Sequence, residues 1–322
     1  MTDALDRTRV AVASRSFSRH PILRAEMLAR YPKTTFNDAG VSLSGDRLIA
    51  FLDGHEKAIT ALETIDADLL DALPGLKVIG KYGVGLDMID QDAMHQRGVA
   101  LGWTGGVNKR SVTELVVSFA IALLRHVPAA NAEVRAGTWR QHLGRYLSGR
   151  TVGIVGCGHV GKDLTPVLNA FGCSVLAHDI LDFPDFYTAN HVEPVGLDEL
   201  LRRSDIVTLH LPLDETTRNI LSAERLALMR SDAILINAAR GGLVDEQALK
   251  AMLMTGRLAS AAFDVFSTEP PEDTELLSLP NFLATPHIGG SAEEAVLAMG
   301  RAAIDGLENN SIPSPVSDHI KS

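Results

Sequence analysis

Cysteine, aromatic side chains and positive charge are all scarce in this chain of 322 residues. Two cysteines, Cys157 and Cys173, cannot build a disulfide framework, and they lack the spacing of a metal site. Small buried apolar side chains are the better interpretation of both. A net charge of −10 argues against nucleic acid and against an anionic membrane as partners. We therefore expect no metal ion and a location in the reducing cytoplasm.

Long hydrophobic runs are missing as well. The most apolar long stretch, Leu115–Leu124, is too short to span a bilayer. The polar first residues, MTDALDRTRV, predict no signal peptide. With 46% hydrophobic and 22% charged residues, the composition is typical of a soluble globular protein, and the length suffices for two domains.

The stretch Thr151–Lys162, TVGIVGCGHVGK, is the most informative part of the chain. Apolar residues 151–154 predict the end of a buried strand, a helical pattern runs over 162–171, and a second strand is expected over 173–177. In the turn between strand and helix, Gly156 permits a sharp bend, Gly158 permits close approach of a pyrophosphate, and Gly161 permits close helix packing. The helix amino terminus offers unpaired N–H groups to the phosphates.

Asp179 follows the second strand, about 20 residues beyond the turn, where a carboxylate can bind the ribose hydroxyls of NAD. The same carboxylate would repel a 2′-phosphate, and the next residues are Ile180 and Leu181 rather than arginine, so NAD is favoured over NADP. FAD is a lesser alternative, because FAD-binding turns usually open a chain. A glycine turn without any ligand is the structural alternative.

Strands and helices alternate on both sides of this turn, which predicts an α/β protein with two parallel sheets. In the first third, strands are expected at 10–13, 48–52, 77–80 and 99–101, with helices at 21–30 and 67–73. Beyond the turn, strands are expected at 206–210, 233–237, 259–264 and 282–284, with helices at 197–203, 223–229 and 245–254. We expect a doubly wound Rossmann-type sheet in the second part and a smaller α/β domain in the first.

Two further segments bear on the organisation of the chain. A long apolar helix is expected over Ser111–Arg125, and a closing helix over Ala292–Leu307 that can return to the first domain. Between them, Ala132–Leu147 predicts a helix and arm with two protruding aromatics, Trp139 and Tyr146. An arm of this kind is more often a surface for a partner than an isolated helix, which suggests a dimer.

Three chemically useful side chains follow predicted strands of the second domain: Arg240, Glu269 and His287. Carboxyl ends of strands in one parallel sheet share one edge, so these groups can converge. An arginine can bind a carboxylate bidentately, and a histidine can donate or accept a proton near neutral pH. A glutamate beside that histidine would orient the ring and favour its protonated form. Taken singly, each could instead be a surface ion pair, a structural histidine or a solvated acid.

Other strand ends carry weaker candidates. Asp264 can bond the nicotinamide carboxamide or merely end its strand, and His210-Leu211-Pro212 can form an apolar wall for the adenosine half. In the first domain, the loop Tyr82-Gly83-Val84-Gly85 follows a strand, and its exposed N–H groups can hold a carboxylate. An ordinary strand-to-helix turn is an equally good interpretation of that loop.

At this point the sequence resembles the D-isomer-specific 2-hydroxyacid dehydrogenases, a family that includes D-glycerate, D-lactate and 3-phosphoglycerate dehydrogenases. The resemblance covers nearly the whole chain and rests on ordered motifs: KYGVGLDMID, NKRSVTELVVSFAIALLR, the GCGHVG turn with Asp179, LHLPLDETTRNIL, INAARGGLVDE, FDVFSTEPP and TPHIGG.

The resemblance implies that Arg240, Glu269 and His287 are the catalytic residues, and that Val84 and Gly85 present N–H groups to the substrate carboxylate. It implies a homodimer, and a discontinuous flavodoxin-like substrate domain (1–104 and 290–322) around an NAD-binding domain (105–289). The resemblance implies cofactor contacts at Val160, Asp179, Pro212, Thr217, Ala238 and Asp264, and we expect further contacts at the three glycines and His159 of the turn and at His210.

The implied reaction is hydride transfer between nicotinamide and C2 of a small D-2-hydroxy acid or 2-oxo acid, with His287 handling the proton and Arg240 the carboxylate. Phosphoglycerate-type relatives place arginines after the strand aligned with Ile49–Leu52, whereas this chain has Asp53–Lys57 there. We therefore expect an unphosphorylated substrate such as glyoxylate, hydroxypyruvate or a sugar-derived acid, although Arg15 and Lys57 could supply positive charge. Phosphoglycerate is the second choice, and an NAD(H)-sensing protein resembling corepressors is the non-enzymatic alternative.

Overall fold

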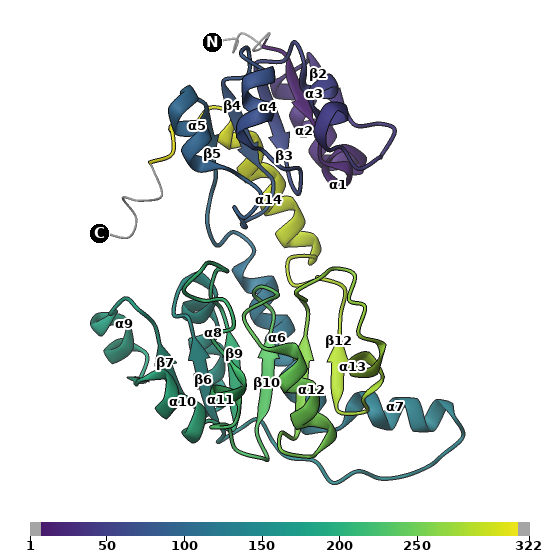
Figure 1. Cartoon of the computed structure of the whole chain (residues 1–322), viewed down its shortest axis with the longest axis vertical. Coiled ribbons are helices and arrows are strands. Elements are labelled where there is room, and N and C mark those ends of the chain that lie inside the picture. The colour runs from purple at the N-terminus through teal and green to yellow at the C-terminus, as the bar shows by residue number, and fades with distance from the viewer. Residues whose placement is uncertain (1–7, 315–322) are drawn as a thin grey trace. The chain divides into compact units, whose positions relative to one another are not determined.

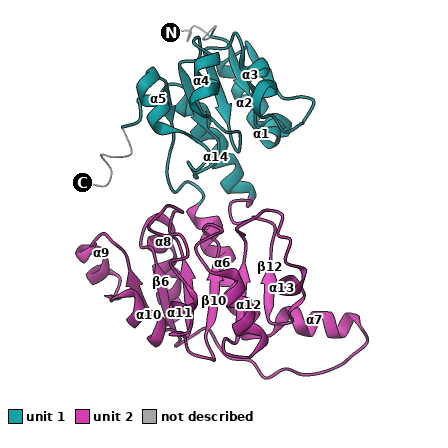
Figure 2. Cartoon of the chain, in the orientation of Figure 1, with its two compact units in different colours: residues 1–108, 293–322 teal, residues 109–292 magenta. Residues whose placement is uncertain are grey.

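The computed structural model describes residues 8–314, which form two compact units (Figures 1 and 2). Unit 1 comprises residues 1–108 and 293–322, and unit 2 comprises residues 109–292. The boundaries between the two domains were predicted from the sequence at 104/105 and 289/290. The expected absence of a signal peptide falls mostly on residues 1–7, which lie outside the described part.

Unit 1 is a five-stranded parallel sheet in the order β2-β1-β3-β4-β5, with helices on both faces. Its elements are β1 (Val10–Val12), α1 (Arg15–Arg19), α2 (Pro21–Arg30), β2 (Thr34–Phe36), α3 (Gly45–Leu52), β3 (Lys57–Thr60), α4 (Ala67–Ala72), β4 (Val78–Lys81), α5 (Gln91–Arg97), β5 (Ala100–Gly102) and α14 (Glu293–Gly306).

Two glycines attach the last helix to this sheet. A Cβ added at Gly80 in β4 would lie 2.5 Å from the carbonyl oxygen of Ala303, and one at Gly102 in β5 would collide with the backbone of Gly306. Because both positions lack a side chain, α14 packs its backbone directly on β4 and β5. The end of the described chain therefore belongs to the same unit as its beginning.

The predicted strand at 48–52 is wrong, because these residues belong to helix α3. Leu48 and Leu52 are both fully buried and four residues apart, so they share one face of a helix, as the 3.6-residue period requires. The strand that pairs with β1 begins only at Lys57. A short apolar run fits either periodicity, and here the packing of a helix on the sheet decided the outcome.

Unit 2 is a seven-stranded, fully parallel sheet in the order β12-β11-β10-β9-β6-β7-β8, which confirms the predicted doubly wound sheet. Its elements are α6 (Lys109–Leu124), α7 (Val127–Arg135), β6 (Thr151–Val155), α8 (His159–Ala170), β7 (Ser174–His178), α9 (Pro184–Ala189), β8 (Val192–Pro194), α10 (Leu197–Arg203), β9 (Ile206–Leu209), α11 (Ala223–Leu226), β10 (Ile234–Asn237), α12 (Glu246–Met254), β11 (Ser260–Phe263), α13 (Thr274–Ser278) and β12 (Phe282–Ala284).

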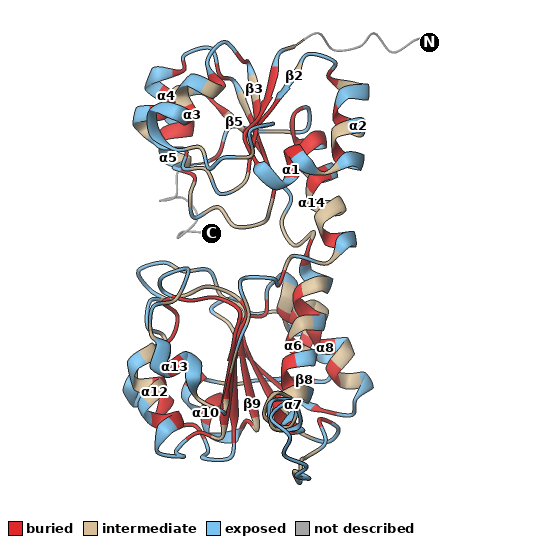
Figure 3. Cartoon of the chain, turned by 90° about the vertical axis from the view of Figure 1, so that its right-hand side faces the viewer, coloured by how far each residue is buried: buried red, intermediate tan, exposed pale blue. Residues whose placement is uncertain are grey.

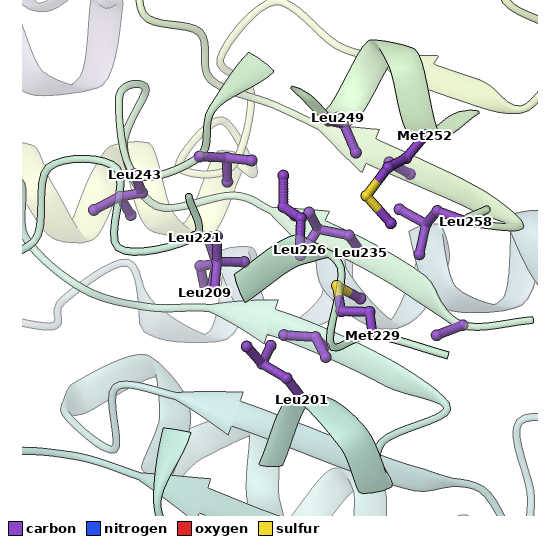
Figure 4. Packing of buried hydrophobic residues seen from close by; sticks show 14 of the residues in the cluster. Leu201, Leu209, Leu221, Leu226, Met229, Leu235, Leu243, Leu249, Met252 and Leu258 are labelled. Carbon is purple, nitrogen blue, oxygen red and sulfur yellow. The ribbon is translucent and has the colours of Figure 1, made fainter. Parts of the chain in front are cut away.

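Each face of the unit 2 sheet has its own apolar core (Figure 3). Alternate residues of one strand serve opposite faces: in β10, Leu235 packs with α10–α12, whereas Ile234 and Ile236 pack with α6 and α8. Figure 4 shows the first of these cores, where leucines and methionines from helices, strands and the connections between them meet. Burial on both faces explains why these strands read as continuous apolar runs.

The predicted helix and arm at 132–147 are only partly correct. Helix α7 begins earlier, at Val127 with a proline in its first turn, and ends at Arg135, after which residues 136–147 have no regular structure. None of the residues of α7 is buried in the chain. Among residues 8–314, no single helix is long and apolar enough to cross a membrane, although α6 and α7, bent by 63°, reach that length and composition together.

Candidate functional site

The glycine turn after β6 is shaped by two of its three glycines. Gly156 has φ of +98°, and a Cβ there would lie 2.6 Å from the carbonyl oxygen of His210. A Cβ at Gly161 would collide with the carbonyl oxygen of Gly156, so this glycine lets α8 approach the turn. Gly158, in contrast, is exposed, and no atom of the described part of the chain lies within 4 Å of its added Cβ. The middle glycine thus leaves open space where a ligand could approach the backbone.

Helix α8 begins at this turn without a side-chain cap. Among the described residues, the N–H groups of its first turn, from His159 to Gly161, have no acceptor. Unpaired N–H groups of this kind and the helix dipole attract an anion. His159 is exposed at the start of the helix, and Val160 packs partly against the core.

Asp179 lies beside the turn because β7 is the neighbour of β6. Its Oδ2 accepts a hydrogen bond from the backbone N–H of Cys157 at 2.6 Å, and its Oδ1 accepts one from Leu181 at 2.9 Å. A carboxylate has about four acceptor sites, so two remain for ribose hydroxyls. The Cys157 thiol itself is fully buried, and desolvation raises its pKa to about 11.

The loop after β9 carries three of the predicted cofactor residues and is stabilised by hydrogen bonds between its own residues. The Thr217 hydroxyl donates to the carbonyl oxygen of Pro212 at 2.8 Å and accepts from the N–H of Asp214 at 2.8 Å. The His210 Nε2 lies 3.1 Å from the Thr208 hydroxyl, and desolvation lowers the pKa of His210 to about 3, so its ring is neutral. The structure thus gives Thr217 a role in shaping the loop.

Arg240 is presented by the turn that follows β10. The buried Asn237 side chain donates to the carbonyl oxygen of Arg240 at 2.8 Å and accepts from the N–H of Ala239 at 3.2 Å, which fixes the turn. The Arg240 guanidinium is partly buried and donates to the carbonyl oxygen of Ala239 at 2.7 Å. Ala238, a predicted cofactor contact, is buried in the same turn.

The turns after β10 and β11 lie directly against each other. A Cβ added at Gly241 would collide with the carbonyl oxygen of Phe266, so only glycine fits at this contact. The turn that carries Arg240 therefore rests on the Phe266–Glu269 loop. Glu246, at the start of α12, accepts from the N–H and the hydroxyl of Ser267 at 2.8 and 3.0 Å and fixes the same loop from its other side.

Asp264, at the end of β11, shapes the loop that carries His287. Its carboxylate is 1% exposed and accepts three hydrogen bonds from this loop: from the Thr285 hydroxyl at 2.5 Å, from the N–H of Ile288 at 2.8 Å and from the N–H of Gly289 at 2.7 Å. The backbone oxygen of Asp264 accepts from the N–H of His287 at 2.9 Å. A contact of Asp264 with a cofactor carboxamide stays a prediction.

Glu269 and His287 form a direct pair across neighbouring loops. The Oε2 of Glu269 lies 2.9 Å from Nδ1 of His287, while its Oε1 accepts from the N–H of Phe266 at 3.1 Å. His287 has the unusual φ of +54°, which the hydrogen bonds from its loop to Asp264 support. The His287 and Glu269 side chains are 51% and 40% exposed, so the ring can meet a ligand while Glu269 orients it.

In unit 1, the loop after β4 offers unpaired donors. Gly83 has φ of +118°, and Trp103 Nε1 donates to the carbonyl oxygen of Val84 at 3.0 Å. Among residues 8–314, the N–H groups of Gly83, Val84 and Gly85 have no acceptor. Successive free N–H groups of this kind form an anion-binding concavity.

Lys81, the last residue of β4, was not predicted to have a role, although it is only 4% exposed next to this loop. The sequence signal that could have indicated a role is a lysine at the last position of a buried strand, directly before a glycine-rich loop.

The loop at 53–57, whose sequence disfavours a phosphate, lies at the wrong end of β3. Residues 53–56 connect α3 to the amino end of β3, and Lys57 is the first residue of that strand, so neither lies at the carboxyl edge where ligands collect. The segment at the carboxyl end of β3 is 61–64, and there Glu63 accepts from the N–H of Ala61 at 2.6 Å. This segment contains no basic residue. Arg15 does lie at the carboxyl edge, exposed at the start of α1.

Together, the parallel sheet, the uncapped helix behind a glycine turn and the acid at the next strand define a dinucleotide-binding α/β protein. Residues 117–289 match the family described as "D-isomer specific 2-hydroxyacid dehydrogenase, NAD binding domain". This match covers more than half of the chain, and the chain therefore belongs to the D-isomer specific 2-hydroxyacid dehydrogenase family.

Individual relatives point to the same family. A hydroxypyruvate reductase of Thermotoga maritima is 39% identical over 241 residues, covering 73% of this chain and 78% of the relative. A D-3-phosphoglycerate dehydrogenase of Methanocaldococcus jannaschii is 39% identical over 239 residues, covering 73% of this chain and 46% of the relative. The chain thus spans about half the length of the phosphoglycerate dehydrogenases that it matches.

Solved structures agree on the fold. A Thermus thermophilus protein superposes with a TM-score of 0.83 at 33% identity, covering 96% of this chain and 100% of the other. A glyoxylate reductase from Paecilomyes thermophila superposes with a TM-score of 0.85 at 25% identity, covering 98% of this chain and 100% of the other.

Proposed function

We propose that the chain is an NAD-dependent oxidoreductase that interconverts a small D-2-hydroxy acid and its 2-oxo acid in the cytoplasm. The observation that carries the proposal is the Glu269–His287 pair, with Oε2 and Nδ1 at 2.9 Å, at the carboxyl edge of the sheet that also carries the glycine turn. A partly exposed histidine oriented by a carboxylate is suited to proton transfer, which a protein that only binds NAD does not need.

The chain's own residues fit the cofactor. The open space at Gly158 and the unpaired N–H groups of α8 suit a pyrophosphate, and Asp179 retains acceptor sites for ribose hydroxyls. When bound, the nicotinamide would supply or take up the hydride, which no side chain can do. His159 and Val160 lie in the first turn of α8, while His210, Pro212 and Ala238 lie at the same sheet edge.

Each catalytic candidate has a separable role. His287 would donate a proton from Nε2 to the carbonyl oxygen in reduction and accept it in oxidation, because Nδ1 is engaged with Glu269. Arg240 would bind the substrate carboxylate, for which a guanidinium is suited. Val84 and Gly85 would add N–H donors to a carboxylate, as the resemblance implies. Their N–H groups have no acceptor among the described residues, which supports that role.

An unphosphorylated substrate remains the favoured choice. The corrected loop after β3, residues 61–64, presents Glu63 and no basic side chain, which disfavours a phosphate. Exposed Arg15 at the same edge keeps 3-phosphohydroxypyruvate as the second candidate. The two relatives at 39% identity do not separate these choices, because one is a hydroxypyruvate reductase and the other a phosphoglycerate dehydrogenase.

The test is NADH oxidation, followed at 340 nm, by the full chain with glyoxylate, hydroxypyruvate, pyruvate and 3-phosphohydroxypyruvate. We expect turnover with at least one of the first three and a higher kcat/KM than with the phosphorylated acid. NADH binding without oxidation by any of the four would contradict the enzyme and favour an NAD(H)-sensing protein. NADPH is the matched cofactor control.

We also propose a homodimer assembled through the arm at 127–147. The supporting observation is its exposed apolar surface: no residue of α7 is buried, and Trp139, Leu143 and Tyr146 are 86%, 97% and 77% exposed. Side chains of this kind are normally covered by a partner. In sedimentation, Leu143→Glu should move the protein from dimer to monomer, whereas Leu62→Glu, at an exposed leucine in unit 1, should not. A monomeric wild-type chain would contradict the proposal.

A further inference from the structure

Lys81 is a buried charge that the proposed mechanism does not use. Its side chain is 4% exposed at the carboxyl end of β4, in a sheet whose other buried positions are mostly apolar. Burying an ammonium group is costly unless hydrogen bonds and nearby negative charge compensate for the lost water. The contacts of Lys81 show which groups its ammonium group binds.

The ammonium group joins the two loops at this edge of the unit 1 sheet. Its Nζ donates to the carbonyl oxygen of Ala61, in the segment after β3, and lies 3.5 Å from that of Tyr82, in the loop after β4. A Cβ added at Gly83 would lie 3.5 Å from the same Nζ. The charge thus lies against the start of the Gly83–Gly85 loop, next to Gly83.

Two aromatic contacts fix the loop from its other sides. The Tyr82 ring packs edge-on against Phe17 with centroids 5.5 Å apart, and Trp103 Nε1 donates to the carbonyl oxygen of Val84. The loop is therefore held in place, while the N–H groups of residues 83–85 find no acceptor within residues 8–314. Fixed N–H groups beside a buried positive charge form a stronger anion site than either feature alone, because both bind negative charge without reorganisation.

We propose that Lys81 is a positioning and specificity residue, whose buried ammonium fixes the Gly83–Gly85 loop for a substrate carboxylate and selects anionic over neutral carbonyl compounds. The inference rests on the proposed function, in which this loop binds the carboxylate of a 2-oxo acid. Under this proposal, unit 1 contributes a positive charge to carboxylate binding in addition to the backbone N–H donors. Lys81 is not a catalytic residue, because it acts through the loop.

The test uses the full chain with NADH and oxalate, a carboxylate analogue of small 2-oxo acids, as the probe. Lys81→Gln removes the charge but keeps an N–H donor for the Ala61 carbonyl, whereas Lys81→Arg keeps the charge. Lys77→Gln is the control, because Lys77 is exposed and pairs with Glu56 at 3.3 Å before β4 begins. Oxalate Kd is measured by calorimetry, and KM and kcat are measured with glyoxylate and with its neutral amide.

For Lys81→Gln we expect oxalate Kd and glyoxylate KM to rise about tenfold to a hundredfold, with kcat and NADH Kd changed less than about threefold. The ratio of kcat/KM for glyoxylate over its amide should fall by a similar factor. Lys81→Arg should bind oxalate within about threefold of wild type, and Lys77→Gln should match wild type.

Three results would overturn the inference: an unchanged oxalate Kd and glyoxylate KM in folded Lys81→Gln, an equal loss of oxalate affinity in Lys81→Arg, or no oxalate binding by the wild-type chain. Failure of the proposed function is distinguishable, because it would appear as absent NADH oxidation with every 2-oxo acid while oxalate binding still reports on Lys81.

Discussion

Replacing Glu269 by glutamine tests the central pair of the site with one changed atom. In the structure the carboxylate accepts two hydrogen bonds, from Nδ1 of His287 at 2.9 Å and from the N–H of Phe266 at 3.1 Å. A carboxamide has one acceptor oxygen and one donor NH2, so it can satisfy only one of these donors. If its oxygen stays on Phe266, the NH2 group faces Nδ1 and requires that nitrogen to be an acceptor.

The consequence is a histidine in the wrong protonation state for both directions of the reaction. With Nδ1 as acceptor, the neutral ring carries its proton on Nε2, which cannot take a hydroxyl proton and is a weak acid toward a carbonyl. We therefore expect kcat to fall in reduction and in oxidation alike. The affinity for NADH should stay within about twofold of wild type, because Glu269 follows β11, which β10 and β9 separate from β6 and its glycine turn.

The size of the loss follows from the exposure of the pair. A hydrogen bond to a charged group contributes about 1.5–3 kcal/mol when well shielded. Because the His287 and Glu269 side chains are 51% and 40% exposed, solvent screening favours the lower end, about 1.5 kcal/mol or about tenfold in rate. The tautomer effect adds to this, and we expect kcat to fall about tenfold to a hundredfold.

The assay is steady-state kinetics in both directions with stopped-flow NADH binding. Glu272→Gln is the matched control, because it makes the same substitution at an exposed glutamate of the same loop. A Glu269→Gln enzyme that keeps more than half of the wild-type kcat in both directions, with normal NADH binding, would refute the proposed coupling of this pair to proton transfer.

Further predictions concern the rest of the site. His287→Ala should lower kcat about a hundredfold to ten-thousandfold with NADH Kd unchanged. Arg240→Ala should raise KM as well as lower kcat. Normal steady-state kinetics in either variant would contradict the catalytic role proposed for that residue. Gly158→Ala should melt like wild type yet bind NADH weakly, because the added Cβ meets no protein atom, whereas Gly161→Ala should lose stability and binding together in calorimetry. The pKa of His210 is about 3 in the folded chain and about 6.5 in the unfolded chain, so the free energy of unfolding should fall as pH drops from about 6.5 towards 3. His210→Gln should show a smaller dependence of this free energy on pH. Equal pH dependence of the two proteins in urea titrations would contradict this prediction.

The glycine turn could be identified from sequence because its constraints are local. Gly156 and Gly161 fill positions that a Cβ would block, and an acid after the next strand completes the pattern within about 30 residues. The position of Arg240, Glu269 and His287 at one sheet edge could also be anticipated, since every strand of a parallel sheet ends on the same side.

Other features depended on which segments meet in space. The helix at Gly45–Leu52 and the true position of the loop after β3 were missed, because a short apolar run is ambiguous until its packing partner is known. The hydrogen bonds from Thr285, Ile288 and Gly289 to Asp264 join loops more than 20 residues apart.

The sequence by itself determined the parallel α/β class, the glycine turn and the identity of the chemically useful side chains, because these follow from periodicity and from residue chemistry. Only the tertiary structure decided that Glu269 bonds Nδ1 of His287, that Asp264 shapes the loop around it, and that Lys81 is buried next to Gly83. Pairings of this kind depend on strand order and on which backbones pack together, and neither is encoded in any short stretch of the chain.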